Sequence, residues 1–416
     1  MTRFRLLYVG LVGASLGLSL VPHSPFGMPA AHAEETDKLR PEVGKPLQKA
    51  QDFVKQHKLP EATAQVHEAE GAKNKTAYES FVIEQVRGSI AQASGDTAAA
   101  AKSYEAQLAS GRVSGAEQTK LVMAVASMSY QAKDYPKAIT WIQRYFKEGG
   151  TDPAMRTLLI QSYYLSGDYA SAGKAQAEQI AAEEKSGSKP AEDQLQLLAA
   201  CQTQAKDNTG FAATMEKLVI YYPKKDYWAQ LIHGLQVKPG FSDRLTLDLD
   251  RLQLAVGTLS TSAQYMDMAQ IALQSGLTGE AKAIVDKGYS TGVLGTGAEA
   301  ARQQRLKDLV TRTMAEDQQN LGKGDAEAAA AKDGQALLDV GAKYVSYGTF
   351  DKGIPAMEQA VRKDALKRPE DAKLHLGLAY MAAGQKAKAV QMLKTVGGTD
   401  GTADLARLWI LQIGKV

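Results

Sequence analysis

Residues 121–184 read LVMAVASMSYQAKDYPKAITWIQRYFKEGGTDPAMRTLLIQSYYLSGDYASAGKAQAEQIAAEE and contain one pattern twice. A polar turn is followed by an aromatic residue and, three positions later, by a small one: Asp134, Tyr135 and Ala138, then Asp168, Tyr169 and Ala172. The two aspartates are 34 positions apart. On both sides of each turn, apolar residues recur at the i, i+3, i+4 spacing of an amphipathic helix. The stretch therefore predicts two consecutive helix pairs built on one template.

This 34-residue period, with small residues where the helices of a pair cross, resembles the tetratricopeptide repeat (TPR) family. Residues 369–401 carry the resemblance best, with Leu376, Gly377, Ala379, Tyr380, Gly384, Ala389 and Leu393 at template positions. Template departures, such as Ile160 for Gly and Gly353 for Ala, blur the repeat count. The resemblance implies an all-α fold: an α-solenoid superhelix of about ten helix-turn-helix units, in which each pair buries its apolar side against its neighbours.

The clarity of the pattern divides the chain into four parts. Residues 1–33 precede the array, 34–223 form an N-terminal array, 224–332 hold irregular units, and 333–416 hold C-terminal units with a capping helix from Arg407 to Ile413. In the irregular part we expect a loop at 292–297, one long polar helix at 298–321 and a short Ala-rich helix at 325–332. Glycine in the turn of a pair is expected to adopt a positive φ at the end of the first helix.

Composition supports helices and argues against several classes of partner. Apolar residues make up 44% of the chain but aromatic ones only 7%, and no run alternates in the manner of a strand. Without residues 1–33 the chain has 47 basic and 46 acidic side chains. This near-neutral balance gives no electrostatic case for binding nucleic acid or an anionic membrane surface. The acidic residues are scattered singly along helix faces, and we interpret them as solvated surface.

Residues 1–33 resemble a secretory signal peptide. Arg3 and Arg5 are followed by an apolar stretch, Leu6 to Val21, and by a small-x-small site at Ala31-His32-Ala33. The apolar stretch is shorter than the roughly 20 residues of a membrane-spanning helix. We expect export to the periplasm of a bacterium, cleavage after Ala33 and no integral membrane span afterwards. The alternative is that the leader is retained as an anchor.

The sequence contains no recognisable catalytic, cofactor or metal motif. The histidines beyond the leader lack metal spacing, and the glycine-rich run at 292–297 lacks the Lys-Ser/Thr of a phosphate loop. Cys201, the only cysteine, fits a small buried apolar residue in a helix. We therefore expect no enzyme activity, no cofactor and no metal.

The resemblance implies that the first helices of the pairs line a concave groove that holds a peptide or a partner's helix. Carried over by position, the groove residues are Met123, Ser127, Tyr130, Thr157, Gln161, Tyr164, Gln196, Ala200, Thr203, Leu374, Leu378 and Met381. The mixture of Tyr, Met, Gln and Thr suits a helix or an extended segment. For Tyr130 and Tyr164, packing between helices is an equal alternative.

Two functional hypotheses follow from the export signal and the array. The first is a non-catalytic periplasmic scaffold that binds another protein of the cell envelope through the groove. The second is a structural or assembly component of envelope transport or secretion machinery that acts by self-association. A third, an enzyme with a site in the irregular region 241–320, has less support in the sequence.

Overall fold

The computed structural model describes residues 37–363 and 366–414, so the predicted leader lies outside the described residues. Within these ranges the chain is helical and contains no strand, as predicted. The helices form two compact units that divide after Thr151, here called the first and the second unit. This division falls inside the range 34–223, which the sequence analysis treats as one array.

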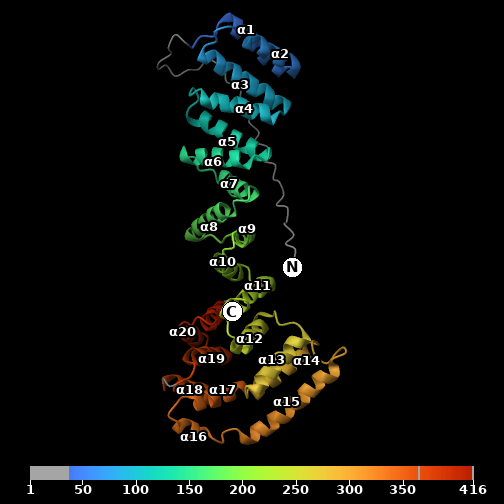
Figure 1. The fold of residues 1–416 in the computed structure, drawn as a ribbon, viewed down its shortest axis with the longest axis vertical. Coiled ribbons are helices and arrows are strands. Elements are labelled where there is room, and N and C mark those ends of the chain that lie inside the picture. The colour runs from blue at the N-terminus through green and yellow to red at the C-terminus, as the bar shows by residue number, and fades with distance from the viewer. Residues whose placement is uncertain (1–36, 364–365, 415–416) are drawn as a thin grey trace. The chain divides into compact units, whose positions relative to one another are not determined.

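The first unit consists of three hairpins (Figure 1), in which α1 packs against α2, α3 against α4, and α5 against α6. The hairpins follow one another in sequence order, because α2 also contacts α3 and α4 also contacts α5. The helices are α1 Pro41–Lys55, α2 Leu59–Glu70, α3 Ala77–Ser94, α4 Thr97–Ala109, α5 Gly115–Gln131 and α6 Tyr135–Lys147.

The second unit starts with the same kind of hairpin and becomes less regular. Its elements are α7 Pro153–Leu165, α8 Tyr169–Lys185, α9 Glu192–Gln204, α10 Asn208–Tyr221, α11 Lys225–Gln236, η1 Asp243–Leu245, α12 Thr246–Val256, α13 Ser262–Gln274, α14 Thr278–Ser290, α15 Ala300–Asn320, α16 Asp325–Ala330, α17 Gln335–Ser346, α18 Phe350–Arg362, α19 Pro369–Ala382, α20 Lys386–Leu393 and α21 Thr402–Ile413. Pairs α7–α8, α9–α10, α13–α14, α17–α18 and α19–α20 pack as hairpins.

Four of the hairpins turn at an aspartate that caps the second helix. Asp134 Oδ1 accepts a hydrogen bond from the backbone N–H of the third residue of α6, at 3.2 Å, and Asp168 Oδ1 does the same for α8, at 3.1 Å. Asp96 and Asp207 cap α4 and α10 in the same way. A carboxylate at this position satisfies an otherwise unpaired backbone donor. In these four hairpins, the aspartate that sets the period of the sequence is therefore the residue that starts the second helix.

The residue before each of these aspartates has a positive φ. The angle is +75° at Gly95 and +85° at Gly167, which confirms the prediction for glycine, but it is also +61° at Lys133 and +59° at Lys206. A non-glycine residue pays roughly 1–2 kcal/mol for this conformation. The helix cap that follows offsets part of that cost.

Close crossing of the paired helices depends on glycine at α17–α18. A Cβ atom on Gly341 would lie 2.8 Å from the Gly353 carbonyl oxygen and 2.6 Å from Met357 Cγ. Gly353, which departs from the template, faces Gly341 across this crossing and is equally crowded. The departure thus has a packing reason: two glycines let the backbones of α17 and α18 meet.

We expect Gly341→Ala to lower the free energy of unfolding by about 1–3 kcal/mol, because the helices must separate to admit the methyl group. The matched control is Gly234→Ala in α11, where an added Cβ would meet nothing within 4 Å. That variant should be more stable by about 0.5–1 kcal/mol, since alanine favours a helix. Urea unfolding followed by circular dichroism measures both, and equal effects would contradict this account of the crossing.

The two helices expected near the end of the range 224–332 are present, but they do not pack against each other as a hairpin. A long helix (α15) and a short Ala-rich one (α16) are present, and 292–297 lies in the connection before α15. However, α15 packs against α13 and α14, whereas α16 packs against α17. Only Gln303, Leu306 and Val310 of α15 are buried, so this helix has too narrow an apolar stripe to hold a hairpin partner.

The second unit returns on itself, which the sequence analysis does not predict. The C-terminal helix α21 covers α19 and α20, as expected of a cap, but it also packs against α10 and α12 (Figure 1). The Ser242 N–H donates to the Asp400 carbonyl at 3.0 Å, and Lys238 pairs with Asp404 at 2.7 Å. One apolar core runs from α8 to α21 through these contacts.

Candidate partner-binding site

The predicted groove residues of α5 and α7 occupy equivalent places in their hairpins. Met123, Ser127 and Tyr130 on α5, and Gln161 and Tyr164 on α7, are half-buried, while Thr157 is exposed. The Tyr130 ring meets Tyr135 edge-on, with ring centroids 5.8 Å apart, and the Tyr164 ring meets Tyr169 likewise at 5.3 Å. Each tyrosine thus packs against the aromatic residue of its own turn and still has part of its surface exposed, so both interpretations of these rings apply.

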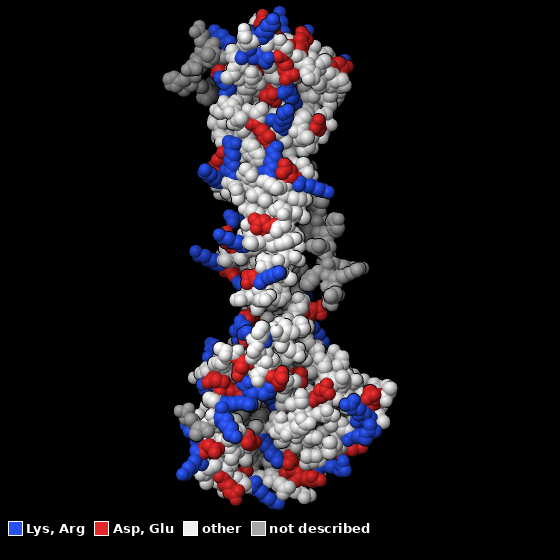
Figure 2. Space-filling view, in the orientation of Figure 1, with Lys and Arg blue, Asp and Glu red and all other residues white. Residues whose placement is uncertain are grey.

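The residues of α9 form a similar but more exposed set. Gln196 and Thr203 are exposed and Ala200 is half-buried. The Gln196 amide donates to the Tyr227 hydroxyl at 2.6 Å, and this hydroxyl in turn donates to Glu192. Burial, together with the Glu192 hydrogen bond, raises the pKa of Tyr227 to about 12. Together α7 and α9 present uncharged side chains at all six predicted positions, and Figure 2 shows uncharged surface over much of α7–α10 on the face in view.

The last predicted helix requires a correction. Leu374 is 0% exposed, and its side chain belongs to the core of the second unit. Leu378 and Met381 are half-buried and pack against the same core. The reason is that α21 packs against α19, and α12 reaches α19 through the Asp248–His375 pair, so a helix face that would be open at the end of a linear array is covered. Leu374 is therefore a core residue and is not available to a partner.

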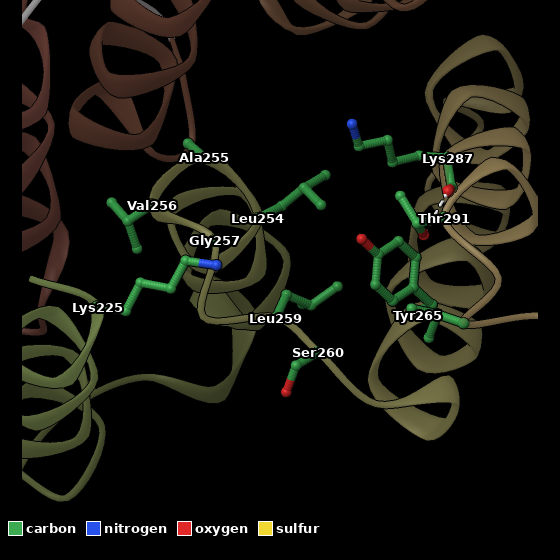
Figure 3. Close-up of a pocket in the computed structure, with 11 residues that line it drawn as sticks. Lys225, Leu254, Ala255, Val256, Gly257, Leu259, Ser260, Tyr265, Lys287 and Thr291 are labelled. Carbon is green, nitrogen blue, oxygen red and sulfur yellow. Dashed lines mark hydrogen bonds between the residues drawn. The ribbon is translucent and has the colours of Figure 1, made fainter.

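A hollow of about 440 Å³ lies where the end of α12 meets α13 and α14 (Figure 3). Leu254 and Leu259 face Tyr265 and Thr291 across the open space, and lysines approach from two sides. The lining residues are Lys225, Leu254, Ala255, Val256, Gly257, Leu259, Ser260, Tyr265, Lys287, Thr291 and Val293. None was predicted, because they come from four helices and two loops that share no sequence motif.

A chain of four charged or titratable side chains links α14, α12 and α19. Arg251 donates to Glu280 through Nε and Nη2, at 2.7 and 2.6 Å, and to Asp248 through Nη1 at 2.6 Å. His375 Nε2 lies 3.1 Å from the Asp248 carboxylate. Burial alone would raise the pKa of Asp248, but His375 and Arg251 hold this pKa well below its usual range. We call Glu280, Arg251, Asp248 and His375 the charge chain.

A second cluster lies where the polypeptide returns on itself. Arg244 in η1 donates two parallel hydrogen bonds to Asp371 on α19, both at 2.8 Å. Its Nη2 also donates to Asp400 at 2.6 Å, just before α21. The Asp371 and Asp400 hydrogen bonds raise the pKa of Arg244 despite its partial burial. Paired arginine–carboxylate bonds of this geometry fix orientation, so this cluster and the charge chain hold the returning helices together.

The interpretation of acidic residues as solvated surface is wrong for this part of the chain. Asp248 is 3% exposed, and its partner His375 lies 127 positions away in the sequence. No local pattern reports such a pairing. The one available signal is the pair Asp248 and Arg251, which are three positions apart on one helix face.

Asp250, also on α12, shows the opposite electrostatics. Burial and the charge of nearby Asp267 raise the pKa of Asp250 to about 6. Because this value lies above the roughly 3.9 of an unfolded aspartate, stability falls as the pH rises from about 4 to about 6. Asp250→Asn should therefore raise the melting temperature near pH 7, and the gain should vanish below about pH 4.

Thermal unfolding across the pH range checks this, with Asp248→Asn as the matched control on the same helix. That variant removes a carboxylate whose pKa is lowered, so it should be less stable than the parent near neutral pH. A lower melting temperature for Asp250→Asn near pH 7 would contradict the assignment.

Two further observations concern the described residues as a whole. No group of three or more His, Cys, Asp or Glu side chains in them is arranged to hold a metal ion. None of their helices is both long and apolar enough to cross a membrane.

The fold and the site residues define an all-α repeat protein with tetratricopeptide-like hairpins. No family model matches the chain, and no curated protein matches it in sequence. Similar solved structures include the Naa15/Naa10 complex bound to HypK-THB (TM-score 0.31, 16% identity), in which 86% of this chain aligns with 58% of that one. A second is yeast Tom70 (TM-score 0.24, 12% identity), in which 90% of this chain aligns with 96% of the Tom70 chain.

A third is the TPR2AB domain of yeast Sti1 in its pHSP90 complex (TM-score 0.23, 11% identity). In this comparison 72% of this chain aligns with 99% of the Sti1 domain. This chain spans less than two thirds of the length of the Naa15/Naa10 chain that it matches. With TM-scores this low, the assignment of the fold rests on the hairpins, caps and helix crossings of this chain itself.

Proposed function

We propose that this protein is a non-catalytic scaffold that binds another protein through the first helices of its hairpins. The observation that carries the proposal is the row of uncharged, partly or fully exposed side chains on α7 and α9, which includes Gln161, Tyr164, Ala200 and Thr203. Partly exposed tyrosines supply large contact area at low conformational cost. Amides and hydroxyls beside them supply hydrogen bonds without the desolvation cost of charges.

We further propose that the protein works in the periplasm of a bacterium, after cleavage behind Ala33. The support is the signal-like composition of residues 1–33, with two arginines, an apolar stretch and a small-x-small site. The partner would then be a protein of the cell envelope. The intact mass of the protein purified from the envelope tests this proposal: the expected chain begins at Glu34, and a chain that keeps its leader in the cytoplasm would overturn it.

Site-specific photo-crosslinking tests the scaffold proposal. A photoreactive residue at Gln161 or Thr203, on first helices, is expected to crosslink a distinct envelope protein in cells. The matched controls are Lys174 and Glu178, exposed positions on the second helix α8, which should give no such product. Equal products from both helices would overturn the proposed surface. Products that contain only further copies of this chain would instead favour self-association, the alternative function.

A further inference from the structure

The hollow at the end of α12 carries two lysines and no acidic residue. Neither Lys225 nor Lys287 has an ion pair or a hydrogen bond from its side chain within the described part of the chain. Figure 3 shows Lys225 reaching over Gly257 and Lys287 approaching from the other side, above Thr291. The Lys225 ammonium would lie only 3.3 Å from a Cβ atom at Gly257, so the glycine makes room for it.

The two ammonium groups lie near the C-terminal ends of two helices, where they offset part of the negative partial charge of those ends. Lys225 lies beside the C-terminal end of α12, and Lys287 lies in the last turn of α14. A helix C-terminus carries about −0.5 of an elementary charge. The N-terminal ends of α11 and α13, which begin at Lys225 and Ser262, carry the opposite partial charge, so the helix ends do not cancel the two ammonium groups. The two lysines, and the absence of an acidic residue from the described lining, therefore favour an anionic group in the hollow.

Apolar and polar groups share the rest of the wall, and the hollow is open to solvent. Leu254, Leu259 and Val293 contribute its walls, and the ring of Tyr265 is 4% exposed. The rim residues Ala255, Ser260 and Thr291 are exposed. A small ligand normally buries 70–90% of its own surface. A hollow as open as this one would leave more of a small ligand exposed, so it suits one part of a longer polypeptide that continues into solvent.

We propose that this hollow binds an acidic, apolar segment of a partner protein, in which one carboxylate stands directly beside a large apolar side chain. The proposal rests on the scaffold function given above and names the chemistry of the segment that is bound. The apolar side chain enters between Leu254, Leu259 and Tyr265, while the carboxylate lies between Lys225 and Lys287. Neither contact requires the first-helix faces of α7 and α9.

Selection from a random heptapeptide library on the immobilised full-length protein tests the proposal. We expect enriched peptides to pair Asp or Glu with a neighbouring Leu, Ile, Phe or Trp. The double variant Lys225→Gln/Lys287→Gln should bind these peptides about tenfold more weakly, the order expected of two partly exposed ion pairs. The parent's affinity should fall as salt is added. Thr291→Trp, which keeps both lysines and fills the hollow, should also lose binding.

The matched control is Lys45→Gln/Lys49→Gln on α1, which makes the same change of charge at two exposed positions and should bind as the parent does. Melting temperatures confirm that each variant is folded. Peptides that bind the Lys225/Lys287 variant as tightly as the parent, but not Gln161→Ala/Tyr164→Ala, overturn the hollow and leave the scaffold function in place. Enrichment of peptides without a carboxylate overturns it as well. If no peptide is enriched at all, the hollow proposal fails, and the scaffold function is decided separately by the photo-crosslinking from Gln161 and Thr203.

Discussion

Replacing Arg251 with alanine is expected to lower the free energy of unfolding by roughly 3–5 kcal/mol. The guanidinium group bonds two carboxylates at once, and the side chains of Asp248 and Glu280 are only 4% and 22% exposed. Without Arg251 these two negative charges stay buried, with His375 as the remaining partner of Asp248. Because the charge chain connects α12 to α14 and α19, the loss should appear as unfolding of the second unit.

Urea unfolding of the purified protein measures this effect. The matched control is Arg302→Ala, because Arg302 pairs with Glu299 at 3.6 Å and both side chains are more than half exposed. It should change stability by no more than about 0.5 kcal/mol. The triple variant Asp248→Asn/Arg251→Met/Glu280→Gln should recover much of the loss, since neither carboxylate is then left without its guanidinium partner. Equal stability of Arg251→Ala and Arg302→Ala would show that the charge chain contributes nothing to the fold.

Leu374→Ala is expected to cost about 2–5 kcal/mol, the usual range for truncating a buried leucine. Leu374 is 0% exposed and packs in the core that joins α19 to the returning helices. The effect on partner binding should be no larger than the accompanying loss of folded protein. This outcome separates a core residue from the groove residue that the repeat template alone predicts.

The control is Ile220→Ala on α10, a side chain of similar size that is 50% exposed. Its truncation should leave stability nearly unchanged. The measurement pairs thermal unfolding with the photo-crosslinking yield from Thr203. A Leu374→Ala variant that is as stable as the parent but has lost its crosslink would restore Leu374 to the partner-binding surface.

Much of the local structure was predictable, because it depends on residues close together in the sequence. In four turns the aspartate accepts a hydrogen bond from a backbone N–H only three residues away, so its recurrence at spacings of 38, 34 and 39 positions reports these hairpins directly. The glycine turn at Gly167 and the long and short helices of the irregular region are local features of the same kind. The candidate groove residues on α5, α7 and α9, which the repeat resemblance implies by position, are half-buried or exposed.

The sequence by itself determined that the described part of the chain is all-α and built of helix hairpins, and it located the aspartate and glycine turns of those hairpins, since these features arise from hydrogen bonds and side-chain periodicity within one or two turns. Only the tertiary structure decided that α21 returns to α10 and α12, that Leu374 is core, and that His375 pairs with Asp248. These depend on contacts between segments more than 100 positions apart, which side-chain spacing along one helix does not encode. The hollow between Lys225 and Lys287 is of the same kind: its walls meet only after the helices have packed.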